Sequence, residues 1–144
     1  MHTRSHAVLA LVLLATGACQ RATEASATAR EVDPLAALQL DAGKRWISDD
    51  HTRTSLAGMR AAVQAAAGDP SRERTIALGK QLQDLGDRLV AGCTMTGPAH
   101  DALHHYLGVL LPDIHRMTGS DFEAARQARR EVAAILDRFG DYFQ

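Results

Sequence analysis

The chain has 144 residues, with 16 lysine and arginine residues against 17 aspartate and glutamate residues, and a formal net charge of −1 at pH 7. This balance leaves no basic surface of the kind on which nucleic-acid binding depends, so no nucleic-acid partner is expected. The length suits one folded domain after a leader, and no apolar run approaches the roughly 20 residues of a membrane-spanning helix.

Residues 1–18 have the pattern of an export signal. A basic start with Arg4 precedes an apolar stretch over 7–15, and small residues follow. This pattern predicts a signal peptide that is removed during export. Because two small residues stand directly before Cys19, the site resembles a bacterial lipobox, in which the cysteine is lipidated and becomes the mature N-terminus. Thr16 departs from the lipobox pattern, since leucine is commoner there.

We therefore expect a periplasmic lipoprotein that is anchored to a membrane through a lipid on Cys19. Gln20 follows, and by resemblance to enteric lipoproteins a residue other than aspartate there indicates the outer membrane. The alternative is cleavage by the ordinary signal peptidase, after Ala18 or within 25–27, which gives a soluble periplasmic protein. Residues 19–33 are small and polar without helical or strand periodicity, which predicts a flexible tether.

Residues 34–144 carry the apolar spacing of helices. Asp33 followed by proline is a favourable helix start, and apolar residues then recur three or four positions apart as far as Trp46. The spacing resumes after a polar segment over 48–52. Since Ser48 can cap a helix, we expect either one long helix with a polar middle or a helical arm that breaks near Ser48.

A second helix is expected from Asp69-Pro70, with an apolar stripe that ends at Cys93. Positions on one stripe share a helix face, so Cys93 is predicted to face the core. A third helix is expected to start at Thr96-Gly97-Pro98, because a capping residue there precedes a proline.

The fourth expected helix opens with Ser120 and Glu123 at the spacing of a capping box. Its polar face carries Arg126, Arg129 and Arg130, which we interpret as solvated charges because acidic residues elsewhere balance them. Four amphipathic helices with short connections and no strand pattern predict an all-α fold, an up-down-up-down antiparallel four-helix bundle over 34–144.

This topology gathers chemically versatile side chains from all four helices at one pole of the bundle. Thiolate, thioether and imidazole together suit Cu(I), and thiolate with imidazole also suits Zn(II). Two histidines one helical turn apart can hold one ion, whereas His105 is expected in solvent. The predicted metal site consists of Cys93, His100, His104, Met95 and His51, with Tyr142 at the same pole.

Other interpretations of these residues stay open. Cys93 can be a small core residue and the histidines surface residues of a helix. A reactive thiol is a further alternative, as is a disulfide between Cys19 and Cys93. Because lipid on Cys19 leaves Cys93 without an intramolecular partner, the state of one cysteine decides that of the other.

The sequence contains no signature of catalysis. A Gly-x-Ser-x-Gly elbow, a phosphate-binding glycine loop and a Cys-x-x-Cys-His haem motif are all missing from the 144 residues. We therefore expect a non-catalytic interaction module with an envelope protein as its partner. The alternative is a periplasmic protein that binds or senses copper or zinc.

Several short motifs carry a family resemblance. They are AGKRW at 42–46, Gly58-Met59-Arg60, Cys93, Leu103-His104 and LDRFGDYF at 136–143. Together they resemble exported helical-bundle proteins of the DnrO-like family, from about Leu35 onward. The resemblance implies an exported helical bundle and no particular activity. Such proteins often carry a histidine and a proline after the final aromatic pair, where this sequence has Gln144, so the resemblance supplies no terminal metal ligand.

Overall fold

The computed structural model of the protein describes residues 33–144. The predicted signal peptide over 1–18, Cys19 and all but the last residue of the predicted tether lie outside the described residues. Within 33–144 the chain forms helices, turns and two isolated β-bridges, and no strand. The prediction of an all-α fold is therefore confirmed for this part of the chain.

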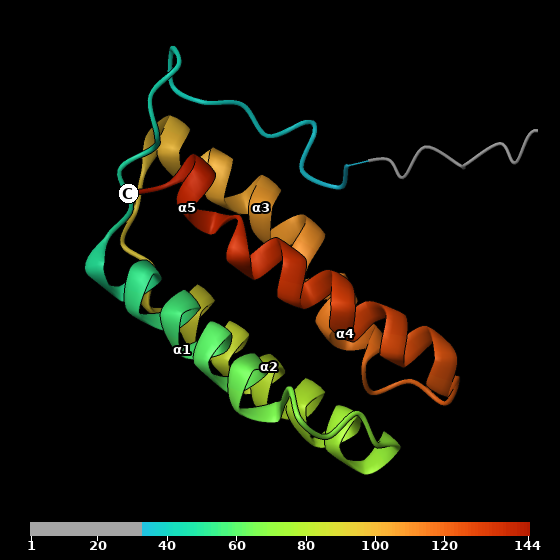
Figure 1. Cartoon of the computed structure of the whole chain (residues 1–144). Coiled ribbons are helices and arrows are strands. Elements are labelled where there is room, and N and C mark those ends of the chain that lie inside the picture. Colours follow the sequence, from blue (N-terminus) through green and yellow to red (C-terminus); the bar gives the residue numbers. More distant parts are fainter. Residues whose placement is uncertain (1–32) are drawn as a thin grey trace, which may run out of the picture. The chain divides into compact units, whose positions relative to one another are not determined.

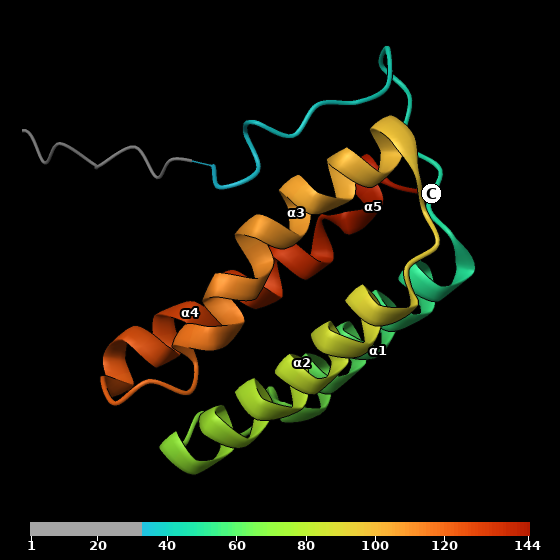
Figure 2. The same cartoon turned by 180° about the vertical axis from the view of Figure 1, so that it is seen from behind.

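Four long helices and one short helix make up a helical bundle. In both views α1 lies beside α2 and α3 beside α4, with α1 and α4 toward the viewer in Figure 1 and α2 and α3 in Figure 2. None of the helices in the described part combines the length and apolarity needed to cross a bilayer. The helices are α1 (Asp50–Ala66), α2 (Arg72–Gly92), α3 (Gly97–Arg116), α4 (Phe122–Asp137) and α5 (Phe139–Tyr142).

The core forms where the apolar stripes of the four long helices meet. Its fully buried side chains include Met59 of α1, Leu82 of α2 and Leu110 of α3. Tyr106 is also fully buried, and its hydroxyl donates to the Ile135 carbonyl at 2.9 Å. Burial raises the pKa of Tyr106 well above its usual value, which keeps the phenol protonated as the donor of this bond.

Both expected forms of a helix before residue 48 are wrong, the long helix with a polar middle and the separate helical arm. After a turn over 34–37 the chain runs without a helix until α1, although Leu35 and Leu38 are buried as their spacing indicated. Ala42 and Gly43 have φ values of 48° and 83°, which a right-handed helix cannot accommodate. The spacing of three between Leu35 and Leu38 therefore does not mark a helix. Residues 33–49 form a turn followed by an extended segment.

The end of the chain explains why this segment is extended. Trp46 N–H donates to the Tyr142 carbonyl at 2.7 Å, and Gln144 N–H donates back to the Trp46 carbonyl at 2.9 Å. Ser48 continues the pairing, since its N–H and its hydroxyl both donate to the Gln144 carbonyl at 2.9 Å. These partners lie about a hundred positions away, so local spacing could not predict them.

Three predicted helix starts move by one or more residues. Asp49, not Ser48, caps α1, and Asp121, not Ser120, caps α4 by accepting from the backbone of Glu123 and Ala124. In both cases the carboxylate stands directly after the serine, and an aspartate is an equally good cap. The α2 helix begins after Ser71 rather than at Asp69-Pro70, whereas α3 begins at Gly97-Pro98 as predicted. These shifts change no helix assignment.

Candidate functional site

Asp49 joins the start of α1 to the chain that follows α2. One carboxylate oxygen accepts from Thr52 N–H at 2.7 Å, and the other accepts from both the N–H and the hydroxyl of Thr94, each at 2.7 Å. Partial desolvation acts to raise the pKa of Asp49, but the hydrogen bonds from Thr52 and Thr94 outweigh it and hold that pKa well below its usual value. The ionised carboxylate thus fixes Thr94, which stands between Cys93 and Met95 in the segment after α2.

The two sulfur atoms predicted to bind metal gather around Thr52. This residue is fully buried, and its hydroxyl lies 3.7 Å from Met95 Sδ and 4.0 Å from Cys93 Sγ. Cys93 is the C-cap of α2 and packs half-buried against the core, as its place on the apolar stripe predicted. It carries a free thiol within the described residues. The structure therefore brings a thiol and a thioether together at the junction of α1 and α2.

His51 lies against the end of α2 but is held by the backbone. Its Nε2–H donates to the Arg88 carbonyl at 3.0 Å, which leaves Nδ1 as the unprotonated nitrogen of the neutral ring. The ring packs on Gly92, where any side chain would overlap it. His51 thus reaches the expected region, with its Nε2 already engaged.

His100 and His104 form the closest pair among the predicted ligands. They lie one turn apart on α3, with Nε2 atoms 3.1 Å apart and ring centroids 4.4 Å apart in an edge-to-face arrangement. In neutral rings one Nε2 must donate and the other accept. Two unprotonated Nε2 atoms in this arrangement would present adjacent lone pairs to a metal ion.

The predicted set divides into separate groups. Among residues 33–144 no three His, Cys, Asp or Glu side chains lie close enough together to hold a metal ion. Tyr142, predicted at the same pole, accepts from Arg138 at 2.9 Å. His105 is exposed, as predicted, and lines an open hollow beside Leu38 and Trp46. The structure brings together Cys93 with Met95 and His100 with His104, and metal binding by either pair stays a prediction.

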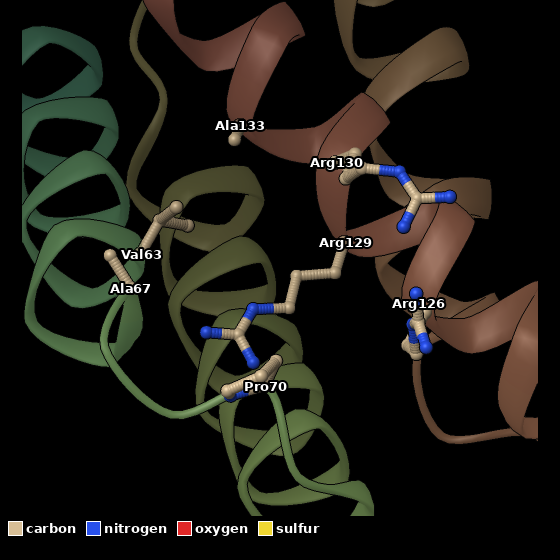
Figure 3. A pocket seen from close by; sticks show the side chains of 7 residues that line it. All are labelled: Val63, Ala67, Pro70, Arg126, Arg129, Arg130 and Ala133. Carbon is tan, nitrogen blue, oxygen red and sulfur yellow. The ribbon is translucent and has the colours of Figure 1, made fainter.

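A different surface stands out between α1 and α4, which we name the α1–α4 seam. It contains two hollows, each lined by apolar side chains and by arginines. The first, of about 240 Å³, is lined by Arg53, Leu56, Ala57, Arg60, Leu136, Phe139, Phe143 and Gln144. The second, of about 290 Å³, is lined by Val63, Ala67, Pro70, Arg126, Arg129, Arg130 and Ala133 (Figure 3).

Arg129 corrects the interpretation of the α4 arginines as solvated charges. Figure 3 shows its side chain extended from α4 toward the loop at Pro70. There it donates to the carbonyl of Ala66, to the carbonyl of Asp69 at 2.8 Å and to the Thr75 hydroxyl at 3.2 Å. Since α1 has no basic residue in its last turn, Arg129 supplies the cation and the donors that the end of α1 lacks. Arg126 and Arg130 are exposed, as predicted.

Arg60 connects the two helices in the first hollow. Its Nη2 donates to the Leu136 carbonyl at 2.6 Å, and its Nε lies 3.3 Å from an Asp137 carboxylate oxygen. The Nε contact counts as an ion pair by distance, but Nε makes no hydrogen bond although it is buried. Arg60 is therefore held in place with one donor unused.

The seam was missed from the sequence, although part of its signal is visible there. Arg53 and Arg60 are seven residues apart, and Arg126 and Arg130 four apart, so each pair shares a helix face. The sequence does not show that this face of α1 lies next to this face of α4. Their adjacency follows from contacts such as Arg129 with Ala66, between residues 63 positions apart.

Comparisons with protein-family models, with curated proteins and with solved structures give no match for this chain. The likeness to DnrO-like proteins therefore rests on the short motifs alone.

Proposed function

We propose that the protein is an exported, lipid-anchored and non-catalytic interaction module, and that it binds an envelope protein along the α1–α4 seam. The observation that carries the proposal is the pair of hollows lined by both apolar side chains and arginines. Specific interfaces combine buried apolar anchors with arginine, which is enriched at such surfaces. No aspartate or glutamate side chain among residues 33–144 lines either hollow.

We also propose that the bundle has up-down-up-down antiparallel topology. Contacts between opposite helix ends support it: Asp49 before α1 bonds Thr94 after α2, and Arg129 in the first half of α4 bonds the end of α1. In such a bundle α1 and α4 are neighbours along their full length. The seam is then one continuous surface rather than two unrelated hollows.

The interaction is tested by site-specific photo-cross-linking in intact cells. A photoreactive residue replaces Ala57, which lines the first hollow, and in a matched strain it replaces Ala91, an exposed alanine of α2 outside the seam. The proposal predicts one protein cross-linked through position 57 and absent at position 91, and saturable binding when both purified proteins are mixed. Equal cross-linking at both positions, or no saturable binding, contradicts it.

The proposed localisation and lipid anchor need a separate test, because they rest on the sequence of residues 1–19. Intact-mass measurement of the mature protein is expected to give an N-terminal Cys19 that carries acyl chains, in the outer-membrane fraction. An unmodified N-terminus at any residue, with the protein in the soluble periplasmic fraction, contradicts lipid anchoring. That result would not bear on the proposal that the α1–α4 seam binds a partner.

The second candidate function is copper or zinc binding or sensing, which the Nε2 to Nε2 distance of 3.1 Å between His100 and His104 favours. The sulfur atoms of Cys93 and Met95 add a soft donor pair suited to Cu(I). Anaerobic titration with Cu(I) and with Zn(II) tests it. Stoichiometric binding that is weakened by His100→Gln or Cys93→Ala supports this function. No tight binding, or binding unchanged in both variants, removes it.

A further inference from the structure

The two hollows of the α1–α4 seam repeat along α1. Leu56 lies in the first and Val63 in the second, seven residues further on. Seven residues make two turns, so the two positions share one face of α1 and lie about 10.5 Å apart along its axis. Each hollow, at about 240 and 290 Å³, is below the usual volume of a small-molecule pocket and suits one apolar side chain of a partner.

The seam also carries an excess of positive charge. Of its five arginines, Arg53, Arg60 and Arg126 pair with acidic side chains, which are themselves 70–97% exposed. Arg129 and Arg130 have no carboxylate within 4.0 Å among the described residues. Arg129 contributes charge, but its Nη groups already donate to Ala66, Asp69 and Thr75. The exposed Arg126 and Arg130, the second of which donates to the Gln127 side chain, are available to a negatively charged partner.

Asp69 offsets a part of this charge at the end of the second hollow. Hydrogen bonds from Ser71 lower its pKa, and the charges of Arg74 and Arg129 contribute less. Asp69 does not line the hollow, whereas Arg126, Arg129 and Arg130 do. The second hollow remains cationic.

We propose that the seam binds an acidic amphipathic helix of the partner, whose two apolar anchor residues stand seven positions apart. This inference rests on the proposed function and names the chemistry of the partner. A helix presents side chains at positions i and i+7 on one face at the spacing of the two hollows, which is the usual geometry of a helix in a groove. Carboxylates beside the anchors complement the guanidinium groups, which hold carboxylates by two parallel hydrogen bonds.

The probe is a synthetic helical peptide of about 18 residues, a length at which helix formation in water becomes favourable. It carries two leucines seven positions apart with glutamates on the flanks. One control peptide has glutamine for every glutamate, and a second has its leucines five positions apart, on different faces. Binding to the full mature chain in detergent is measured by fluorescence polarisation at low and at high salt.

The proposal predicts that the probe binds at least tenfold more tightly than either control peptide, and more weakly at high salt. The double variant Arg126→Gln/Arg130→Gln is expected to bind it roughly tenfold more weakly than the wild type, because two exposed ion pairs with the probe are lost. The matched variant Lys80→Gln/Arg88→Gln removes the same charge from exposed positions of α2 and is expected to bind within about twofold of the wild type.

Three results overturn the proposal. The first is a probe that binds no better than its controls, or equally to both double variants. The second is binding of phosphatidylglycerol vesicles, but not of the probe, that requires Arg126 and Arg130. The third is self-association of the chain that requires them, which would make a second copy the occupant.

The proposed function fails separately from this inference. A partner cross-linked at position 57 together with an inactive probe overturns the acidic helix and leaves the interaction module standing. An active probe with no partner cross-linked at position 57 overturns the interaction module instead.

Discussion

Asp49 and Thr94 are joined by two hydrogen bonds of 2.7 Å to one carboxylate oxygen. The other oxygen of the same carboxylate caps α1 through Thr52. A single ionised group therefore fixes both the start of α1 and the residues after α2, where Cys93 and Met95 lie. Its loss should loosen that whole end of the bundle.

We predict that Asp49→Ala lowers the free energy of unfolding by about 1–3 kcal/mol at pH 7, because a helix cap and the bonds to Thr94 are lost. The folded pKa of Asp49 is depressed, so this stability is present above the unfolded pKa of about 3.9 and is lost as the pH falls below it. Urea denaturation at pH 7 and pH 3 measures the difference. It should shrink at pH 3, and a difference that is equal at both pH values contradicts the role of the charge.

Arg129 is expected to contribute more to stability than its exposed neighbour Arg126. Arg129→Met removes the hydrogen bonds to the Ala66 carbonyl at the end of α1, to the Asp69 carbonyl in the loop and to the Thr75 hydroxyl of α2, and should cost about 1–3 kcal/mol. Arg126→Met removes an exposed ion pair with Glu123 and should cost less than about 1 kcal/mol. Thermal denaturation of both variants gives the comparison. Equal effects would mean that Arg129 is a solvated charge after all.

Two glycines are predicted to respond to alanine in opposite directions. A Cβ at Gly79 would lie 2.9 Å from Met117 Cβ and from Thr118 Cγ2, so Gly79→Ala should destabilise the fold by about 1–3 kcal/mol. A Cβ at Gly58 meets nothing within 4 Å, so Gly58→Ala should stabilise α1 by about 0.5–1 kcal/mol. The urea midpoints of the two variants should move to opposite sides of the wild-type value. Stabilisation by Gly79→Ala would show that α2 and the end of α3 pack less closely than described, and destabilisation by Gly58→Ala would contradict the open space at Gly58.

Metal binding at the histidine pair predicts a rise in melting temperature. A ligand that binds the folded state alone adds stability as its concentration exceeds the dissociation constant, by about 2.7 kcal/mol at a hundredfold excess. The rise with Zn(II) should disappear in His104→Gln and persist in His115→Gln, which changes an exposed histidine near the other end of α3. A rise that is the same in both variants places the metal elsewhere.

Apolar spacing predicted α2, α3 and α4 to within a few residues, because these helices bury one stripe each and their signals are local. The same spacing failed over 33–49, since Leu35 is buried from a turn and Leu38 from the first residue after that turn. The extended conformation there depends on pairing of Trp46 with Tyr142 and Gln144 at the far end of the chain. A pattern in the sequence carries no information about a partner that distant.

In the candidate site, too, some contacts could be predicted from the sequence and others could not. The contact of His100 with His104 follows from their spacing on one helix and could be predicted. The place of Cys93 beside Met95 and Thr52 depended on the packing of α2 against α1. The role of Arg129 could not be predicted, because an arginine on a polar face has the same sequence pattern whether water or a neighbouring helix end receives its donors.

The central claim is that the α1–α4 seam is the surface through which the protein acts. Once a partner has been cross-linked at position 57, its affinity for two purified variants gives the most direct measurement. Ala57→Trp fills the first hollow, and Ala91→Trp adds the same bulk to α2. We predict that Ala57→Trp weakens binding at least tenfold while Ala91→Trp leaves the dissociation constant within about twofold of the wild-type value. Equal affinities of the two variants would contradict the claim.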